Sequence, residues 1–119
     1  MTRRSHKPFI LISYAYMSKP MLATLLALRE DITLTVDSGA FTAYKLGKKI
    51  ELESYMNFLA TSKLKIEHYM NLDVIGDVAA SKKNYYKMLD EGFKPMPVFT
   101  RGAPTSDLEE YYETSDVVA

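Results

Sequence analysis

Residues 32–41 read Ile-Thr-Leu-Thr-Val-Asp-Ser-Gly-Ala-Phe, and this stretch is the basis of the fold prediction. The first five residues are apolar or β-branched, a composition that favours a β-strand. Asp37 follows the strand directly, and Gly39 can take the positive φ of a tight turn. We therefore predict a strand over 32–36 whose carboxyl end carries an acidic side chain.

Stretches on both sides of this strand have a similar character. Residues 9–16 are nearly continuously apolar, as expected of a strand buried on both faces, and residues 66–72 form a third predicted strand. A fourth strand is predicted within 93–100, although two prolines there each remove a donor from the sheet. Residues 116–119 are typical of the opening of a fifth strand.

The segments between these strands are predicted to be helices. Residues 52–59 carry apolar side chains at i, i+3, i+4 and i+7, which indicates an amphipathic helix, and residues 21–29 form another. A third helix is predicted over 77–91, with Asp77 as its N-cap. A fourth, over 106–112, opens with the spacing of a capping box.

Successive strand–helix units of this kind imply an α/β fold with a parallel sheet and right-handed crossovers. An open doubly wound sheet and a closed barrel both satisfy the pattern, and periodicity does not separate them. We expect four strand–helix units whose strands follow the order of the chain and curl like half of a barrel, whereas a doubly wound sheet would reverse its strand order. Residues 1–119 are expected to form a single domain.

Composition is that of a globular protein without disulfides. Apolar residues make up 47% of the 119 residues and charged residues 25%, and there is no Cys. Disulfides and cysteine metal sites are therefore excluded, and no His–acid pair has metal-ligand spacing, so no metal site is predicted. The apolar runs are too short to cross a bilayer, and we expect a cytoplasmic protein with no membrane partner.

The charge is balanced overall but not along the chain. Residues 1–60 carry eight basic and five acidic side chains, and residues 61–119 carry seven and ten. The basic residues that stand out are Arg3, Arg4, Lys7, Lys45, Lys48, Lys49 and Arg101. We interpret them as solvated side chains, because a net charge of zero gives no electrostatic reason for tight nucleic-acid binding. Arg101 could instead contact a phosphate.

Two acids follow consecutive predicted strands. Asp37 follows the second strand and Asp73 the third, and the carboxyl ends of parallel strands meet at one edge of a sheet. Their carboxylates could share a cleft and act as an acid–base pair, or both could cap loops without any chemistry. Phe41 could likewise stack on a planar base or fill the rim of the sheet.

Three motifs in order resemble one enzyme family. Residues 37–41 (Asp-Ser-Gly-Ala-Phe) are similar to the Asp-Ser-Gly-Gly-Phe signature of the tRNA-guanine (queuine) transglycosylases, with Ala40 in place of the second Gly. Together with Asn-Leu-Asp-Val-Ile-Gly-Asp at 71–77 and Pro-Met-Pro-Val-Phe at 95–99, they resemble most the phage and bacterial homologues linked to 7-deazaguanine insertion into DNA.

The resemblance implies a TIM barrel that exchanges guanine for a 7-deazaguanine in DNA or tRNA through a covalent glycosyl–aspartate intermediate. Carried over by motif, Asp37 is expected to be the catalytic acid/base. Ser38, Gly39 and Phe41 would shape the base pocket. Asp73 would recognise the base, because a carboxylate can accept two hydrogen bonds from the N1–H and N2–H₂ edge of guanine.

The family's nucleophilic aspartate and its zinc site are expected downstream of Ala119, so no cofactor is expected within this chain. A complete barrel typically needs about 250 residues, and we expect these 119 to be its N-terminal half, truncated in the fifth strand. A C-terminal half-barrel or self-association would then complete the fold. The alternatives are an inactive remnant, a purine-binding half-barrel, or another barrel enzyme that uses paired aspartates.

Overall fold

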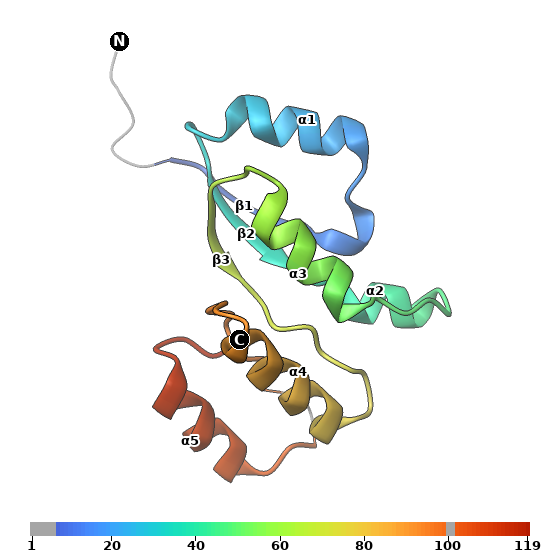
Figure 1. The fold of residues 1–119 in the computed structure, drawn as a ribbon, viewed down its shortest axis with the longest axis vertical. Coiled ribbons are helices and arrows are strands. Elements are labelled where there is room, and N and C mark those ends of the chain that lie inside the picture. The colour runs from blue at the N-terminus through green and yellow to red at the C-terminus, as the bar shows by residue number, and fades with distance from the viewer. Residues whose placement is uncertain (1–6, 100–101) are drawn as a thin grey trace.

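The computed structural model describes residues 7–99 and 102–119 as a mixed α/β domain with a three-stranded parallel sheet and five helices (Figure 1). The elements, in chain order, are β1 (Phe9–Ser13), the 3₁₀ helix η1 (Tyr14–Tyr16), α1 (Lys19–Leu28), β2 (Thr33–Asp37), α2 (Ala40–Lys45), α3 (Leu52–Thr61), β3 (Ile66–Tyr69), α4 (Val78–Asp90) and α5 (Thr105–Thr114). Among these residues, no helix has the length and apolar character needed to cross a membrane.

The sheet follows the order of the chain. β2 lies between β1 and β3, and both pairings are parallel, as the sequence predicts. In the register of the first pair, Phe9 lies beside Thr33 and Ser13 beside Asp37. The register of the second pair shifts between Leu34 and Thr35.

The first strand is shorter than predicted. β1 ends at Ser13, and the predicted strand residues that follow, Tyr14–Tyr16, form η1 instead. The ring of Tyr14 lies 5.4 Å from that of Tyr55 and 5.1 Å from that of Phe58, so the chain turns to place this ring against α3. These contacts override a local sequence that favours a strand.

The predicted fourth strand is reduced to a single bridge, and the predicted fifth strand to backbone hydrogen bonds of Ala119. Met96 pairs in parallel with Met70: its N–H donates to the carbonyl of Tyr69 at 2.8 Å, and its carbonyl accepts from Asn71 N–H at 2.9 Å. Successive backbone groups point to opposite sides of a strand, so the N–H groups that the two neighbouring prolines lack would face away from β3. Ala119 N–H, in turn, donates to the carbonyl of Pro97 at 2.8 Å.

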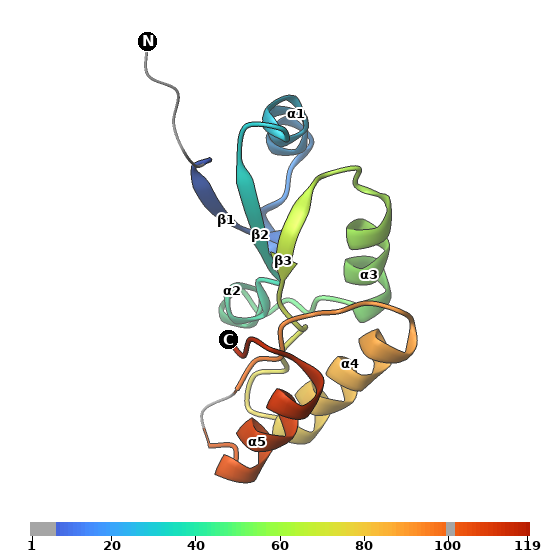
Figure 2. The ribbon, with the colours of Figure 1, turned by 90° about the vertical axis from the view of Figure 1, so that its left-hand side faces the viewer.

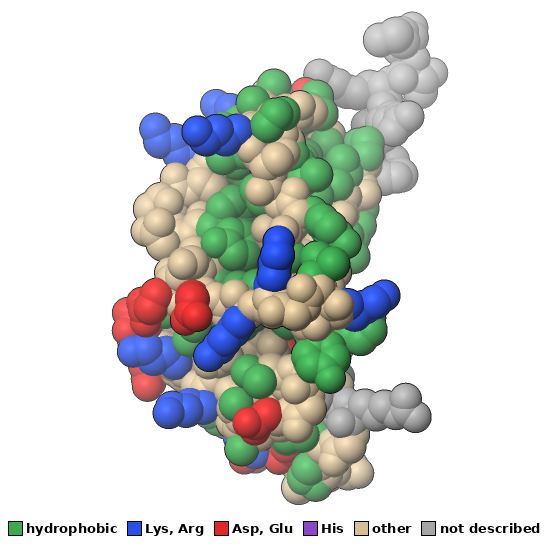
Figure 3. Space-filling model, turned by 90° about the vertical axis from the view of Figure 1, so that its right-hand side faces the viewer, with side chains coloured by type: hydrophobic (Ala, Val, Ile, Leu, Met, Phe, Trp, Pro, Cys, Tyr) green, Lys and Arg blue, Asp and Glu red, His purple; other side chains and the backbone are tan. Residues whose placement is uncertain are grey.

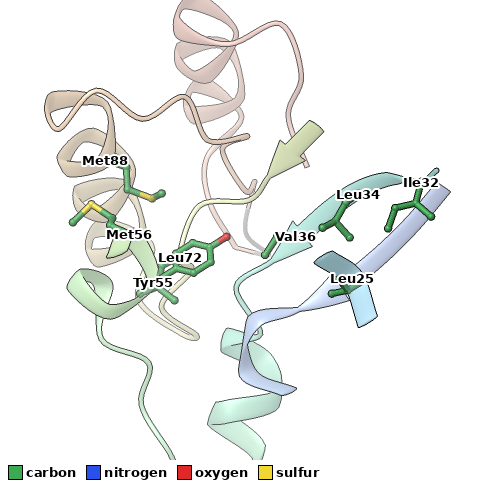
Figure 4. Close-up of a cluster of buried hydrophobic side chains, with 8 residues drawn as sticks. All are labelled: Leu25, Ile32, Leu34, Val36, Tyr55, Met56, Leu72 and Met88. Atoms are coloured by element: carbon green, nitrogen blue, oxygen red, sulfur yellow. The ribbon is translucent and has the colours of Figure 1, made fainter. Parts of the chain in front are cut away.

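Helices α1 and α3 cover one face of the sheet, as Figure 2 shows. On this face Leu34 and Val36 of β2 are buried with Leu25 of α1 and with Tyr55 and Met56 of α3 (Figure 4). These two helices do not cover the opposite face of the sheet. On that face, the side chains of Phe9 and Leu11 in β1 are 64% and 57% exposed.

Helices α4 and α5 lie side by side and are tied by polar and aromatic contacts (Figures 1 and 2). Lys82 Nζ lies 2.7 Å from Oδ1 of Asp107, and the rings of Tyr85 and Tyr111 pack edge to face at 5.2 Å. Asp77 is the N-cap of α4, as predicted, and accepts from Ala80 N–H at 2.9 Å.

The capping box predicted for the last helix is wrong. α5 begins one residue earlier, at Thr105, so that its N-cap is Pro104 and Ser106 lies inside its first turn. The φ of −69° at Pro104 suits a helix entry without a side-chain cap. In place of a side-chain cap, the ion pair between the buried Asp107 and Lys82 of α4 holds the first turn of α5.

Candidate functional site

The turn after β2 is a tight one that only glycine fits. Gly39 has a φ of 82°, in the left-handed region, as the sequence predicts. A Cβ added to Gly39 would lie 2.3 Å from Oγ of Ser13 and 2.4 Å from Cβ of Ala15. The close approach that Gly39 permits is therefore to the end of β1 and to η1.

Asp37 ends β2 on the sheet face that α1 and α3 leave uncovered, because Val36 before it points into the core. Its carboxylate is half-buried, and Oδ1 lies 3.5 Å from Gly39 N–H, the outer limit of a hydrogen bond. Asp37 therefore keeps most of its hydrogen-bonding capacity for a ligand or for water.

Two hydroxyl groups near Asp37 are also unused. Oγ of Ser13 and Oγ1 of Thr35 are buried, and neither has a hydrogen-bond partner among the described residues. Ser13 is the register partner of Asp37, and Thr35 precedes Asp37 on the same face of β2. Burying a hydroxyl without a partner is unfavourable, so this end of the sheet is polar and incompletely satisfied.

Asp73 lies in the loop after β3 and is held from α4. Its Oδ1 accepts a hydrogen bond from Oγ of Ser81 at 2.6 Å. Ser81 is almost fully buried, and its hydroxyl also accepts from Val74 N–H at 2.7 Å. The hydroxyl has a single proton, and the charged carboxylate is its nearest acceptor, so it donates to Asp73 and fixes the orientation of this side chain.

Two amide side chains hold the same loop. Nδ2 of Asn84 donates to the carbonyl of Leu72 at 3.1 Å, and Nδ2 of Asn71 donates to the carbonyl of Ser81 at 2.9 Å. Sequence reasoning missed Ser81 and Asn84 as supporting residues. The available signal was their i, i+3 spacing on a helix that also buries Tyr85 and Met88.

Asp73 lines a cavity of about 570 Å³ at the carboxyl end of the sheet. The walls come from α2, the segment before α3, the loop after β3 and the start of α4, and include Ala40, Tyr44, Lys48, Lys49, Asp73 and Asn84. Lys48 and Lys49 also line a second cavity beside η1.

The other predicted site residues lie beside this cavity and not in its wall. Asp37 is on the uncovered sheet face. Ser38 is buried, and its Oγ accepts from Ala40 N–H at 3.3 Å. Phe41 projects from α2 with 61% of its surface exposed. Contact of one base with both Asp37 and Asp73 therefore stays a prediction.

Burial, and secondarily the charge of Asp37, raise the pKa of Tyr55, whose hydroxyl donates to the carbonyl of Met70 at 2.6 Å. Within residues 7–99 and 102–119, no three His, Asp or Glu side chains gather as metal ligands would. Arg3, Arg4 and Arg101, singled out in the sequence, lie outside the described residues.

No protein-family model, no curated protein and no solved structure matches this chain. The resemblance to the guanine transglycosylases therefore stays an expectation from sequence motifs.

Proposed function

We propose that this chain carries the base-recognition part of a guanine transglycosylase-like site. One observation carries the proposal: the Asp73 carboxylate is oriented by Ser81 and lines a cavity whose volume is typical of small-molecule sites, about 300–1,000 Å³. A carboxylate held in this way is suited to a ligand that presents two neighbouring N–H donors.

Guanine and 7-deazaguanine present such donors at N1–H and N2–H₂. The bond from Ser81 uses one lone pair of Oδ1, which leaves one on that oxygen and two on Oδ2. Adenine has an acceptor at N1 and so cannot form the same pair of bonds. Asp73 thus supports selection of guanine-type bases over other purines.

Asp37 is proposed as the acid/base residue beside the base. Its support is its place at the carboxyl end of β2 and its weak internal hydrogen bond, which leaves the carboxylate available. Ser38 and Gly39 hold the turn that follows, and Phe41 is exposed beyond it. The polynucleotide would be DNA or tRNA.

We further propose that the sheet belongs to a (β/α)₈ barrel. The support is the parallel order of β1, β2 and β3, continued by the bridge of Met96 to Met70 and by the backbone hydrogen bond of Ala119 to Pro97. In such a barrel the exposed Phe9 and Leu11 would face the interior, where the remaining strands or a second half-barrel would cover them.

The proposal is tested by base binding, measured calorimetrically with 7-deazaguanine and 7-deazahypoxanthine. These two bases differ only in the exocyclic amine, and we expect 7-deazaguanine to bind about tenfold more tightly because it alone satisfies both carboxylate oxygens. Asp73→Asn should remove this preference, and Asp90→Asn, an exposed acid at the end of α4, should keep it. Equal binding of both bases by the unmodified chain would overturn the proposal.

Base exchange is a separate measurement. The resemblance puts the nucleophile after Ala119, so we expect this chain to bind the base without incorporating labelled guanine into DNA or tRNA. Exchange by this chain alone, abolished by Asp37→Asn, would show that the nucleophile has been misplaced. A purine-binding module without exchange is the alternative that the cavity at Asp73 also supports.

A further inference from the structure

An exposed aromatic and basic surface lies immediately after the Asp37 turn. Phe41, Tyr44 and Leu46 have 61%, 62% and 61% of their surfaces exposed. Lys45, Lys48 and Lys49 lie among them, and residues 38–50 contain no acid. We call the surface of Phe41, Tyr44, Lys45, Lys48 and Lys49 the α2 platform. Figure 3 faces this end of the molecule and shows basic side chains next to hydrophobic ones.

The local fold fixes which side chains point outward. α2 has only six residues, and it packs Ala40 and Ala43 toward the domain. It ends at Lys45, and Gly47 follows its C-cap with a φ of 69°. Gly47 N–H donates to the carbonyl of Tyr44 at 3.1 Å, and Lys48 N–H donates to the carbonyl of Ala43 at 2.8 Å. This is a Schellman motif, and it sets the direction of the chain at Lys48.

The charges of the platform are not neutralised internally. Across the described ranges, none of its three lysines forms an ion pair with an acid. Nζ of Lys45 lies 5.5 Å from the centre of the Phe41 ring, a cation–π contact that leaves the charge in place. Large exposed aromatic side chains beside uncompensated lysines are typical of a recognition surface and not of a solvated helix.

We propose that the α2 platform binds an unpaired nucleic-acid strand and leads it past Asp37. Phosphates would contact the three lysines, and bases would stack on Tyr44 and Phe41, as in proteins that bind single strands through aromatic side chains in a basic groove. α2 begins three residues after Asp37, so a strand held there passes beside that carboxylate. The inference rests on the proposed function for the role of the strand.

The charge of the lysines and the exposure of the Phe41 and Tyr44 rings favour an unpaired strand over other ligands of the platform. A second copy of this chain would bring three more lysines against these three, which is repulsive. A duplex would offer phosphates but would keep the faces of its bases stacked, so the rings of Phe41 and Tyr44 would gain little. An unpaired strand uses both parts of the platform.

The charge component is tested with a fluorescein-labelled 20-nucleotide single strand of mixed sequence, by anisotropy at several salt concentrations. The variant Lys45→Gln/Lys48→Gln/Lys49→Gln should bind about 10- to 100-fold more weakly near 0.1 M salt, with the salt slope reduced by about 2. The matched control, Lys19→Gln/Lys83→Gln/Lys94→Gln, removes three exposed lysines elsewhere and should change affinity by less than about threefold. Equal losses in both variants would overturn the platform.

The stacking component has its own readout, because the chain contains no Trp. Tyr44→Trp places a single indole on the platform, and we expect its emission to be quenched by the single strand but not by the matching duplex. Tyr44→Phe should keep the affinity, and Tyr44→Leu should lower it about tenfold, since stacking contributes about 5- to 150-fold per base. Unchanged emission on binding, or tighter binding of the duplex, would overturn the proposal.

Separate variants test the base site at Asp73 and strand binding by the α2 platform, so that either proposal can fail without the other. Asp73→Asn should lose selective 7-deazaguanine binding and keep binding of the single strand. Lys45→Gln, the platform lysine that does not line the cavity at Asp73, should weaken binding of the single strand and keep the selectivity for 7-deazaguanine. Circular dichroism melting of every variant checks that the fold persists. If Tyr44→Leu changes the sedimentation coefficient but not strand binding, the platform is a contact between copies and the inference is wrong.

Discussion

Oγ of Ser81 donates a hydrogen bond to Oδ1 of Asp73 over 2.6 Å, so a hydroxyl on α4 determines how a carboxylate in the loop after β3 is presented. The same hydroxyl accepts from Val74 N–H, which makes Ser81 a connection between helix and loop. The orientation of the proposed base-recognition residue thus depends on a residue eight positions away.

Ser81→Ala is expected to lower the free energy of unfolding by about 1–3 kcal/mol, because it leaves a buried N–H and a carboxylate without their partner. It should also weaken 7-deazaguanine binding, since Asp73 would no longer be held in one orientation. Urea unfolding and calorimetry measure the two effects. Ser54→Ala, at an exposed position of α3, is the control and should change neither; an equal loss there would refute the assignment.

Gly39→Ala is expected to lower the free energy of unfolding by about 3 kcal/mol or more, because the new Cβ would overlap Ser13 and Ala15 and φ is positive. Gly76→Ala is the matched control: its φ is 79°, but a Cβ there meets nothing within 4 Å. It should cost only the backbone strain, about 1–2 kcal/mol. Similar losses for both variants in urea titrations would show that β1 does not crowd the turn.

Thr35→Val is expected to raise the free energy of unfolding by about 1 kcal/mol. Oγ1 of Thr35 is buried without a partner, and valine has nearly the same shape without the hydroxyl. Thr33→Val, on the same face of β2 but only partly buried, should change stability by less than about 0.5 kcal/mol. Destabilisation by Thr35→Val, measured by thermal melting, would mean that the hydroxyl does have a partner in solution.

Alkaline pH is expected to weaken the contact between α4 and α5. Burial, followed by the hydrogen bond to Glu110, raises the pKa of Tyr86 to about 12, and the hydrogen bond to Asp107 raises the pKa of Lys82. A raised folded-state pKa contributes stability that is complete below the unfolded-state value, about 10, and is lost as pH rises through the folded-state value.

Stability should therefore fall between about pH 10 and pH 12. Tyr86→Phe should flatten this fall, because it removes one of the titrating groups. Tyr16→Phe, with 60% of its side chain exposed in η1, should leave the profile unchanged. Urea titrations at a series of pH values measure the profile, and a fall equally steep in Tyr86→Phe would contradict this account.

The sequence predicted those elements that depend on short-range pattern. β2 and its turn follow from a β-rich run that ends at Val36 and is followed by Gly39, and α4 follows from Asp77 as N-cap. η1 could not be predicted in the same way, because Tyr14 leaves the strand to contact Tyr55 and Phe58, about forty residues later. Tertiary contacts of this kind override local propensity.

Asp37 and Asp73 were predicted to lie at one edge of the sheet because parallel strands bring their carboxyl ends together. The structure has Asp37 at the end of β2 and Asp73 in the loop after β3, and their role as a site stays a prediction. α2 was missed: its short sequence looks like a polar loop, and its helix depends on Ala40 and Ala43 packing against the domain. Ser81 was missed because only the folded loop after β3 brings its hydroxyl to Asp73.

The bridge at Met96 has a consequence for hydrogen exchange. Residues 95–97 possess one amide proton among them, because the prolines on either side of Met96 have none, and that proton bonds to Tyr69. β2, by contrast, pairs with β1 over its whole length and with β3 from Leu34 to Val36. Local opening should therefore begin at the seam between β3 and this segment, so that the Met96 amide exchanges with deuterium well before those of Leu34 and Val36.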